Sequence, residues 1–178
     1  MRLLLILFVL WPGFALADPD LPASVKARIL KAPDRWLAEM TRLVAGFGGP
    51  AGLTSEGIDR HVAVERAAAR ANALRDLLSA DLDGDGAVSA EEGQEMNLVL
   101  SARGRGAWAL RQAAADQDGN GTLVGAEIVG FAQAQALDRF SDRRADGLRA
   151  VLAFDADGDG AVSIAELLKG VATLVDGA

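Results

Sequence analysis

Three short segments of this 178-residue chain place acidic side chains at alternate positions and close with a glutamate. The segments cover residues 81–92, 116–127 and 155–166. In the first segment, Asp81, Asp83 and Asp85 precede Gly86, which can adopt the positive φ of a tight turn because it has no Cβ. Carboxylates spaced in this way can converge on one point, so each segment is suited to holding a hard divalent cation.

Each loop offers oxygen ligands at its first, third, fifth, seventh and twelfth positions, and a hydroxyl at the ninth can hold a coordinating water. The predicted ligands of the first loop are Asp81, Asp83, Asp85, Ala87 (through its carbonyl), Ser89 and Glu92. Those of the middle loop are Asp116, Asp118, Asn120, Thr122 and Glu127. Those of the last loop are Asp155, Asp157, Asp159, Ala161, Ser163 and Glu166.

The middle loop differs from the other two at two ligand positions. Asn120 replaces a carboxylate, and Val124 offers no side-chain oxygen at the ninth position. Affinity depends on the number of charged ligands and on the rigidity of the site. The middle loop is therefore predicted to bind its ion more weakly than its neighbours.

The ligand types indicate which metal is bound. Ligation by oxygen alone favours Ca²⁺ over Zn²⁺ or Cu²⁺, and Mg²⁺ prefers a tighter octahedron with retained waters. The chain contains no cysteine, so a thiolate metal site is excluded. Up to three Ca²⁺ ions are expected.

The loops are part of a longer repeat. Their first positions are separated by 35 and 39 residues, and 35 residues before Asp81 lies a glycine-rich segment, residues 46–57, that lacks the acidic ligands. The eighth positions of the four segments are all aliphatic: Leu53, Val88, Leu123 and Val162. Apolar residues at helical spacing flank the loops, and a period in this range indicates a repeated helical unit.

With these flanking helices the loops resemble the EF-hand family, and the four units resemble calmodulin-like proteins over about residues 34–175. The resemblance implies an all-α fold of two paired EF-hand lobes, with short two-stranded contacts between the loops. The expected pairs are residues 34–103, with a degenerate first hand, and residues 104–178, with two complete hands. Residues 18–33 read as a tail or linker, and Gly104 and Gly106 as a turn between units.

Some exported bacterial EF-hand proteins of the lanmodulin type select lanthanides instead of calcium. That family has proline at the second loop position and aspartate at the ninth. Here the second positions are Leu82, Gln117 and Ala156, and the ninth positions are Ser89, Val124 and Ser163. These departures favour calcium.

The first 17 residues have the pattern of a secretory signal peptide. A basic start at Arg2 is followed by an apolar run over residues 3–11, and residues 15–17 form a small-x-small cleavage signal. The alternative is a membrane anchor, but the apolar run is shorter than the roughly 20 residues needed to span a bilayer. Cleavage is expected after Ala17, giving a periplasmic or secreted protein with no stable membrane insertion.

The charge distribution limits the partners. The net charge is −7, and twelve of the 25 acidic residues lie in the three loops, which contain no Lys or Arg. Nucleic-acid binding would need a basic stripe with aromatic side chains, which the sequence lacks. The single histidine, His61, has no nucleophile or ligand set near it in the sequence, so an enzyme is not expected.

Two functions fit the sequence. The first is an exported calcium-binding protein that buffers calcium or is stabilised by it. The second is a sensor that exposes a groove and binds a partner protein when loaded. Beyond Met1 the chain has only Met40 and Met96, which argues against a broad methionine-rich groove. A specific partner could still use the aromatic residues Trp36, Trp108, Phe131 and Phe154.

Overall fold

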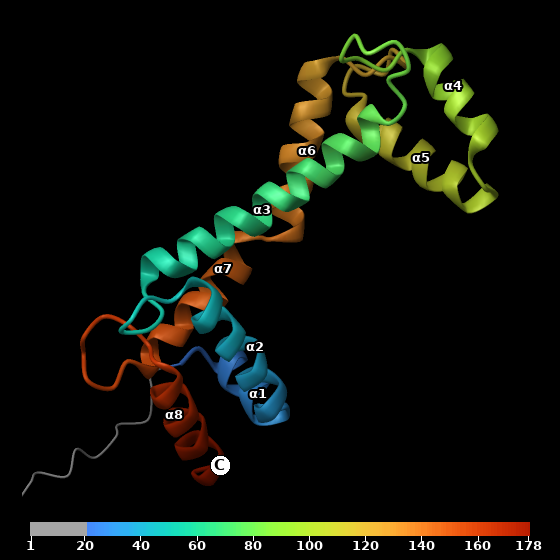
Figure 1. Cartoon of the computed structure of the whole chain (residues 1–178). Coiled ribbons are helices and arrows are strands. Elements are labelled where there is room, and N and C mark those ends of the chain that lie inside the picture. Colours follow the sequence, from blue (N-terminus) through green and yellow to red (C-terminus); the bar gives the residue numbers. More distant parts are fainter. Residues whose placement is uncertain (1–20) are drawn as a thin grey trace, which may run out of the picture.

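The computed structural model describes residues 21–178, so the predicted signal peptide and its cleavage site lie outside the described residues (Figure 1). The described chain is all-α, as expected, apart from two isolated antiparallel bridges. Its helices are α1 (Ala23–Lys31), α2 (Pro33–Phe47), α3 (Ser55–Leu78), α4 (Ala90–Val99), α5 (Ala102–Ala115), α6 (Gly125–Arg139), α7 (Asp142–Arg149), the 3-10 helix η1 (Ala150–Phe154) and α8 (Ile164–Asp176).

Hydroxyl side chains mark the start of most helices that follow a loop or a turn. A Ser or Thr hydroxyl accepts a backbone N–H at the start of each of these helices, which satisfies a donor that has no partner inside the helix. These N-cap residues are Thr54, Ser89, Ser101, Ser141 and Ser163. At Ser89 and Ser163 a glutamate three residues later bonds back to the N-cap backbone, which completes a capping box.

The four loops are joined in pairs by the residues at their eighth positions. Leu53 bridges Val162, and Val88 bridges Leu123, each through two backbone hydrogen bonds of 2.8–2.9 Å. All four side chains are fully buried. The expected contact between eighth positions is therefore present, but the expected partners are wrong, because the outer two loops pair with each other and the inner two pair with each other.

The length of α3 explains this nested pairing. The helix follows the loop at residues 46–57 and runs without interruption to the loop at residues 81–92. Its 24 residues span about 36 Å, so these two loops lie at opposite ends of one helix and cannot touch. By contrast, α4 and α5 are joined by a sharp turn at Leu100 and Ser101. Helix α5 therefore runs back toward the loop at residues 81–92 and brings the middle loop beside it (Figure 1).

Two hydrophobic clusters correspond to the two bridged pairs, so the division into residues 34–103 and 104–178 is not the one that the structure has. The outer cluster contains Ile29 of α1, Trp36 of α2 and Phe154 of η1. The inner cluster contains Leu77 of α3, Trp108 of α5 and Phe131 of α6. Between the two ends, α3 packs along α6, and the molecule is elongated in this direction (Figure 1).

Two further expectations are corrected by the structure. Within residues 18–33, which were expected to be a tail or linker, α1 forms and buries Ile29 completely in the outer cluster. Gly104 and Gly106 lie inside α5 and not in a turn, because Ser101 accepts the N–H of Gly104 and starts the helix before them.

Candidate metal centres

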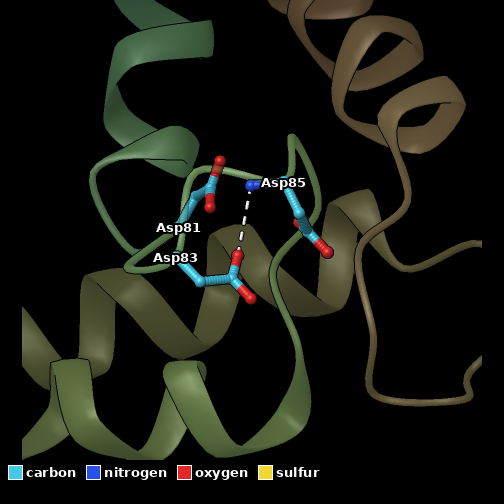
Figure 2. A group of neighbouring side chains, drawn as sticks. All are labelled: Asp81, Asp83 and Asp85. Atoms are coloured by element: carbon cyan, nitrogen blue, oxygen red, sulfur yellow. Dashed lines mark hydrogen bonds between the residues drawn. The ribbon is translucent and has the colours of Figure 1, made fainter.

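In the first complete loop, which joins α3 to α4, the three aspartates are held by backbone N–H groups of the loop itself. Asp81 accepts from Gly84 at 2.7 Å with one oxygen and from Gly86 at 3.0 Å with the other. Asp83 accepts the N–H of Asp85 at 3.1 Å (Figure 2). These bonds hold the carboxylates against the backbone of a tight turn without any contribution from an ion.

Glycines at the fourth and sixth positions allow this turn. In the first loop, Gly84 has φ 79° and Gly86 has φ 86°, values that L side chains rarely adopt. The other two loops repeat both conformations at Gly119, Gly121, Gly158 and Gly160. The prediction of a tight turn rested on the sixth-position glycine alone, although all three loops also have glycine at the fourth position.

Glu92 closes the first loop from the first turn of α4. One carboxylate oxygen accepts the N–H of Leu82 at 2.7 Å, and the other accepts the N–H of Ser89 at 2.8 Å and its hydroxyl at 3.0 Å. The backbone N–H of Ser89, followed by that of Leu82, lowers the pKa of Glu92 below its usual value. The side chain is therefore held as a carboxylate that points back across the loop.

The last loop, which joins η1 to α8, repeats this arrangement. Asp155 accepts from Gly158 at 2.8 Å and from Gly160 at 2.9 Å, as Asp81 does in the first loop. Glu166 accepts from Ala156 and from Ser163, each at 2.8–2.9 Å. Burial alone would raise the pKa of Glu166, but its hydrogen bonds to Ser163 and Ala156 outweigh this effect, so the pKa is lowered.

The middle loop, which joins α5 to α6, has the same backbone bonds with a different fifth residue. Asp116 accepts from Gly119 and Gly121 at 2.8 and 2.9 Å. The Asn120 amide donates to Asp118 at 2.8 Å, and its carbonyl oxygen accepts from the backbone of Thr122. Glu127 is the most buried charged residue described, with 8% of its surface exposed, and its carboxylate accepts the backbone N–H groups of Gln117 at 2.8 Å and Val124 at 3.0 Å.

The spacing of the oxygens tests whether a calcium ion fits. Two oxygens on opposite sides of an ion at about 2.4 Å are about 4.8 Å apart. In each complete loop, one oxygen from each of three acidic residues lies within 4.8 Å of the others, so one ion can contact all three. The groups are Asp81, Asp83 and Asp85; Asp116, Asp118 and Glu127; and Asp155, Asp157 and Glu166.

Some predicted ligands lie outside these groups. Glu92 and Asp159 belong to their loops but their oxygens do not fall within the 4.8 Å groups. The hydroxyls of Ser89 and Ser163, predicted to hold a water, bond to the glutamate of the same loop. The seventh-position residues Ala87, Thr122 and Ala161 each donate an N–H to the fifth-position side chain, so the backbone there is fixed close to the carboxylates.

The degenerate loop at residues 46–57 keeps the structural parts of the repeat and lacks the ligands. Its eighth position, Leu53, forms the bridge, and its ninth, Thr54, caps α3 by accepting the N–H of Gly57 at 3.2 Å. Gly57 stands where the other loops have glutamate. This loop therefore pairs with the last loop and has no acidic residue at a ligand position, since its one acid, Glu56, stands at the eleventh position.

His61, the single histidine, is enclosed by aromatic rings. It lies edge-on to Phe47 and Phe140, with ring centroids 4.8 and 5.7 Å away. Its Nδ1 is buried and has no hydrogen-bond partner within residues 21–178. The side chain therefore takes part in the packing of α3 against Phe47 and Phe140.

Comparison with known proteins identifies the loops. A family model described as EF hand matches residues 74–96 and 152–172, which contain the first and last complete loops with parts of their flanking helices. No curated protein and no solved structure matches the chain. The middle loop lies outside the matched segments, but it has the same glycine conformations and the same type of acidic group. The two matched segments of the chain are therefore similar to EF hands, and calcium is the ion that loops of this type bind.

Proposed function

We propose that this chain is an exported, non-enzymatic protein that binds up to three Ca²⁺ ions through the loops at residues 81–92, 116–127 and 155–166. Its main role is to buffer calcium or to be stabilised by it outside the cytoplasm. The individual ligands are those predicted from the loop positions.

The observation that carries this proposal is the grouping of unneutralised carboxylates in each loop. Three acidic oxygens lie within 4.8 Å of one another, and no ion pair in the described part of the chain joins any of these residues to Lys or Arg. Like charges at this distance repel, and backbone N–H groups offset only part of the repulsion. A divalent cation would convert this repulsion into attraction and stabilise the folded chain.

The three sites are expected to differ in strength. The first and last loops have four acidic residues at ligand positions, whereas the middle loop has three because of Asn120. With fewer charged ligands, the middle site is expected to be the weakest. The burial of Glu127 still supports ion binding in that loop, since a buried carboxylate is costly without a positive charge nearby.

Export rests on the sequence pattern of residues 1–17. In residues 21–178, no helix combines the length and the apolar character that crossing a bilayer requires. Extracellular EF-hand modules commonly bind calcium at about 10⁻⁴–10⁻³ M. We expect affinities in this range, because a periplasmic or secreted protein meets ambient calcium.

The sensor remains the second candidate. The four aromatic residues that could have contacted a partner are all buried in the hydrophobic clusters: Trp36, Trp108, Phe131 and Phe154. Their burial favours the buffering role over target capture. Binding of a hydrophobic dye with and without calcium separates the two, since a large calcium-dependent rise would favour the sensor.

Calorimetric titration of the mature protein, residues 18–178, with CaCl₂ tests calcium binding. The variants Glu92→Gln, Glu127→Gln and Glu166→Gln should each lose the heat of one site. Glu56→Gln in the degenerate loop is the matched control and should leave all three sites intact. If the wild-type protein shows neither heat of binding nor a change in melting temperature between chelator and CaCl₂, the proposal is wrong.

A further inference from the structure

One face of α4 is exposed along its whole length. Positions i, i+3, i+4, i+7 and i+8 share a helix face, and here they are exposed residues: Glu91, Gln94, Glu95, Leu98 and Val99. The first half of the face is acidic. The second half is apolar, with Leu98 83% and Val99 79% exposed.

No other helix within residues 21–178 packs extensively on α4, which lies at the outer edge of the inner-loop end of the molecule (Figure 1). Its attachment to the inner cluster runs through the partly buried Met96. From residue 76 to residue 102 the sequence contains no Lys or Arg, so nothing on this helix balances its glutamates. The exposed face of α4 therefore combines negative charge with uncovered apolar surface.

The same end of the molecule has a groove of opposite character. Helices α3, α5 and α6 line an open groove with a volume of about 470 Å³. Its apolar lining includes Ala73, Leu110 and Phe131. Leu110 is 75% exposed although it is a large aliphatic residue, so this groove also has apolar surface without a partner.

The charged residues on this groove are mainly basic. Arg111 and Arg139 line it, together with Asp76. The carboxylate of Asp76 lies 3.8 Å from Arg75 and 3.8 Å from Arg111, so its charge is already compensated. The side chain of Arg139 forms no ion pair within residues 21–178. Arg139 therefore presents a positive charge to the groove that no acidic side chain within residues 21–178 compensates.

We propose that this groove receives α4 of a second copy of the chain. The acidic residues of that helix, Glu91 and Glu95, would face Arg111 and Arg139, while Leu98 and Val99 would cover Leu110 and its apolar surroundings. Charge complementarity favours this occupant, because the α4 face is acidic and apolar whereas the groove is basic and apolar. Both surfaces belong to the same polypeptide, so a second copy supplies the matching partner.

The arrangement is reciprocal. Each copy carries one α4 face and one groove at the same end, so two copies related by a two-fold axis can exchange helices and cover both surfaces at once. The interaction does not use the ligand positions of any loop. Its failure in an experiment would therefore leave the calcium-binding proposal untouched.

Sedimentation velocity of residues 18–178 in CaCl₂, over a range of protein concentrations, tests the dimer. The wild-type protein should move from monomer to twice that mass as concentration rises. Glu95→Arg and Arg139→Glu should each weaken the dimer by about tenfold or more, because each places like charges together. An equimolar mixture of these two variants should dimerise again, since each α4 then meets a groove of opposite charge.

Leu98→Glu should also abolish the dimer. Leu168→Glu is the matched control, because Leu168 is a similar residue, 51% exposed, on α8 at the other end of the molecule. Circular dichroism and calcium titration of each variant establish that it is folded. A wild-type protein that stays monomeric at all concentrations would overturn the proposal. So would a dimer that is unaffected by both charge reversals, or a mixture that does not restore it.

Discussion

The backbone of Leu53 pairs with that of Val162 through two reciprocal hydrogen bonds, each 2.9 Å long. The first residue belongs to the loop without ligands, and the second to the last complete loop. Both side chains are fully buried. The ligand-free loop is thus held directly against the last complete loop. A substitution that disturbs one of these two loops should therefore change the stability or the calcium affinity of the other.

Gly52 allows this close approach and offers the first test. It has φ 138°, and a Cβ at this position would collide with the backbone of Val162 and Ser163. We expect Gly52→Ala to destabilise the folded chain by about 1 kcal/mol or more, since the native conformation is incompatible with a side chain. Thermal unfolding should show the loss, and calorimetry should show weaker binding at residues 155–166.

Gly49→Ala is the control in the same loop, because a Cβ there meets no atom within 4 Å and φ is not in the positive region. It should leave both the melting temperature and calcium binding close to those of the wild type. Equal effects of the two substitutions would show that the contact with Val162 is not responsible.

The bridge between Val88 and Leu123 predicts coupling between the first two complete sites. Glu92→Gln should weaken calcium binding at residues 116–127 by about fivefold or more, a typical coupling between linked sites. The last site, bridged to the degenerate loop, should change little. Amide NMR can follow the loops separately through Gly121 and Gly160, whose N–H groups donate to Asp116 and Asp155.

The equivalent substitution in the last loop provides the control for this coupling. Glu166→Gln should remove binding in the last loop and leave the titrations of Gly86 and Gly121 unchanged. If Glu166→Gln weakened the first two sites as strongly as Glu92→Gln weakens the middle one, the nested bridges would not govern the coupling.

The sequence predicted the loops better than their pairing. The eighth positions are all aliphatic, so their identities cannot distinguish one partner from another. The pairing could have been predicted from the lengths of the segments that connect the loops. No Gly or Pro interrupts residues 58–80, which indicates one continuous helix and hence two widely separated loops. A helix of this length is incompatible with a pair between the loops at its two ends.

The expected tail at residues 18–33 and the expected turn at Gly104 and Gly106 were wrong, because neighbouring residues outweigh the local effect of proline and glycine there. Pro22 precedes the first residue of α1, a place where the missing N–H of proline is tolerated, and Ile29 supplies the buried contact that holds the helix. Gly104 lies within the first turn of α5, where the Ser101 cap decides the helix start. Ile29 is buried by residues far away in the sequence, so the sequence around α1 could not predict this contact.

The middle loop allows a gain-of-function test. Asn120→Asp would give it the same number of acidic ligand positions as its neighbours. We expect its calcium affinity to rise by about tenfold, equivalent to about 1.4 kcal/mol, because affinity follows the ligand charge. Calorimetry of this variant against Asn120→Ser, which also removes the amide but adds no charge, separates charge from the loss of the hydrogen bond to Asp118. An unchanged affinity in both variants would mean that Asn120 does not limit the site.

The connection between α6 and α7 depends on Arg66 of α3. Its guanidinium donates to the carbonyl of Phe140 at 3.0 Å and to Asp142 at 2.6 Å. Asp142 is largely exposed, so the ion pair itself contributes little. The bond to the Phe140 carbonyl satisfies a partly buried acceptor at the end of α6, and a bond from a charged donor of this kind is worth about 1.5–3 kcal/mol.

We therefore expect Arg66→Met to lower the free energy of unfolding by about 1–2 kcal/mol, whereas Asp142→Asn should have only a small effect. Arg70→Met, on the same helix and without a hydrogen bond or ion pair within residues 21–178, is the matched control. Chemical denaturation of the three variants in chelator gives the comparison without any contribution from calcium. If Asp142→Asn proved as costly as Arg66→Met, the exposed ion pair and not the carbonyl bond would hold this turn in place.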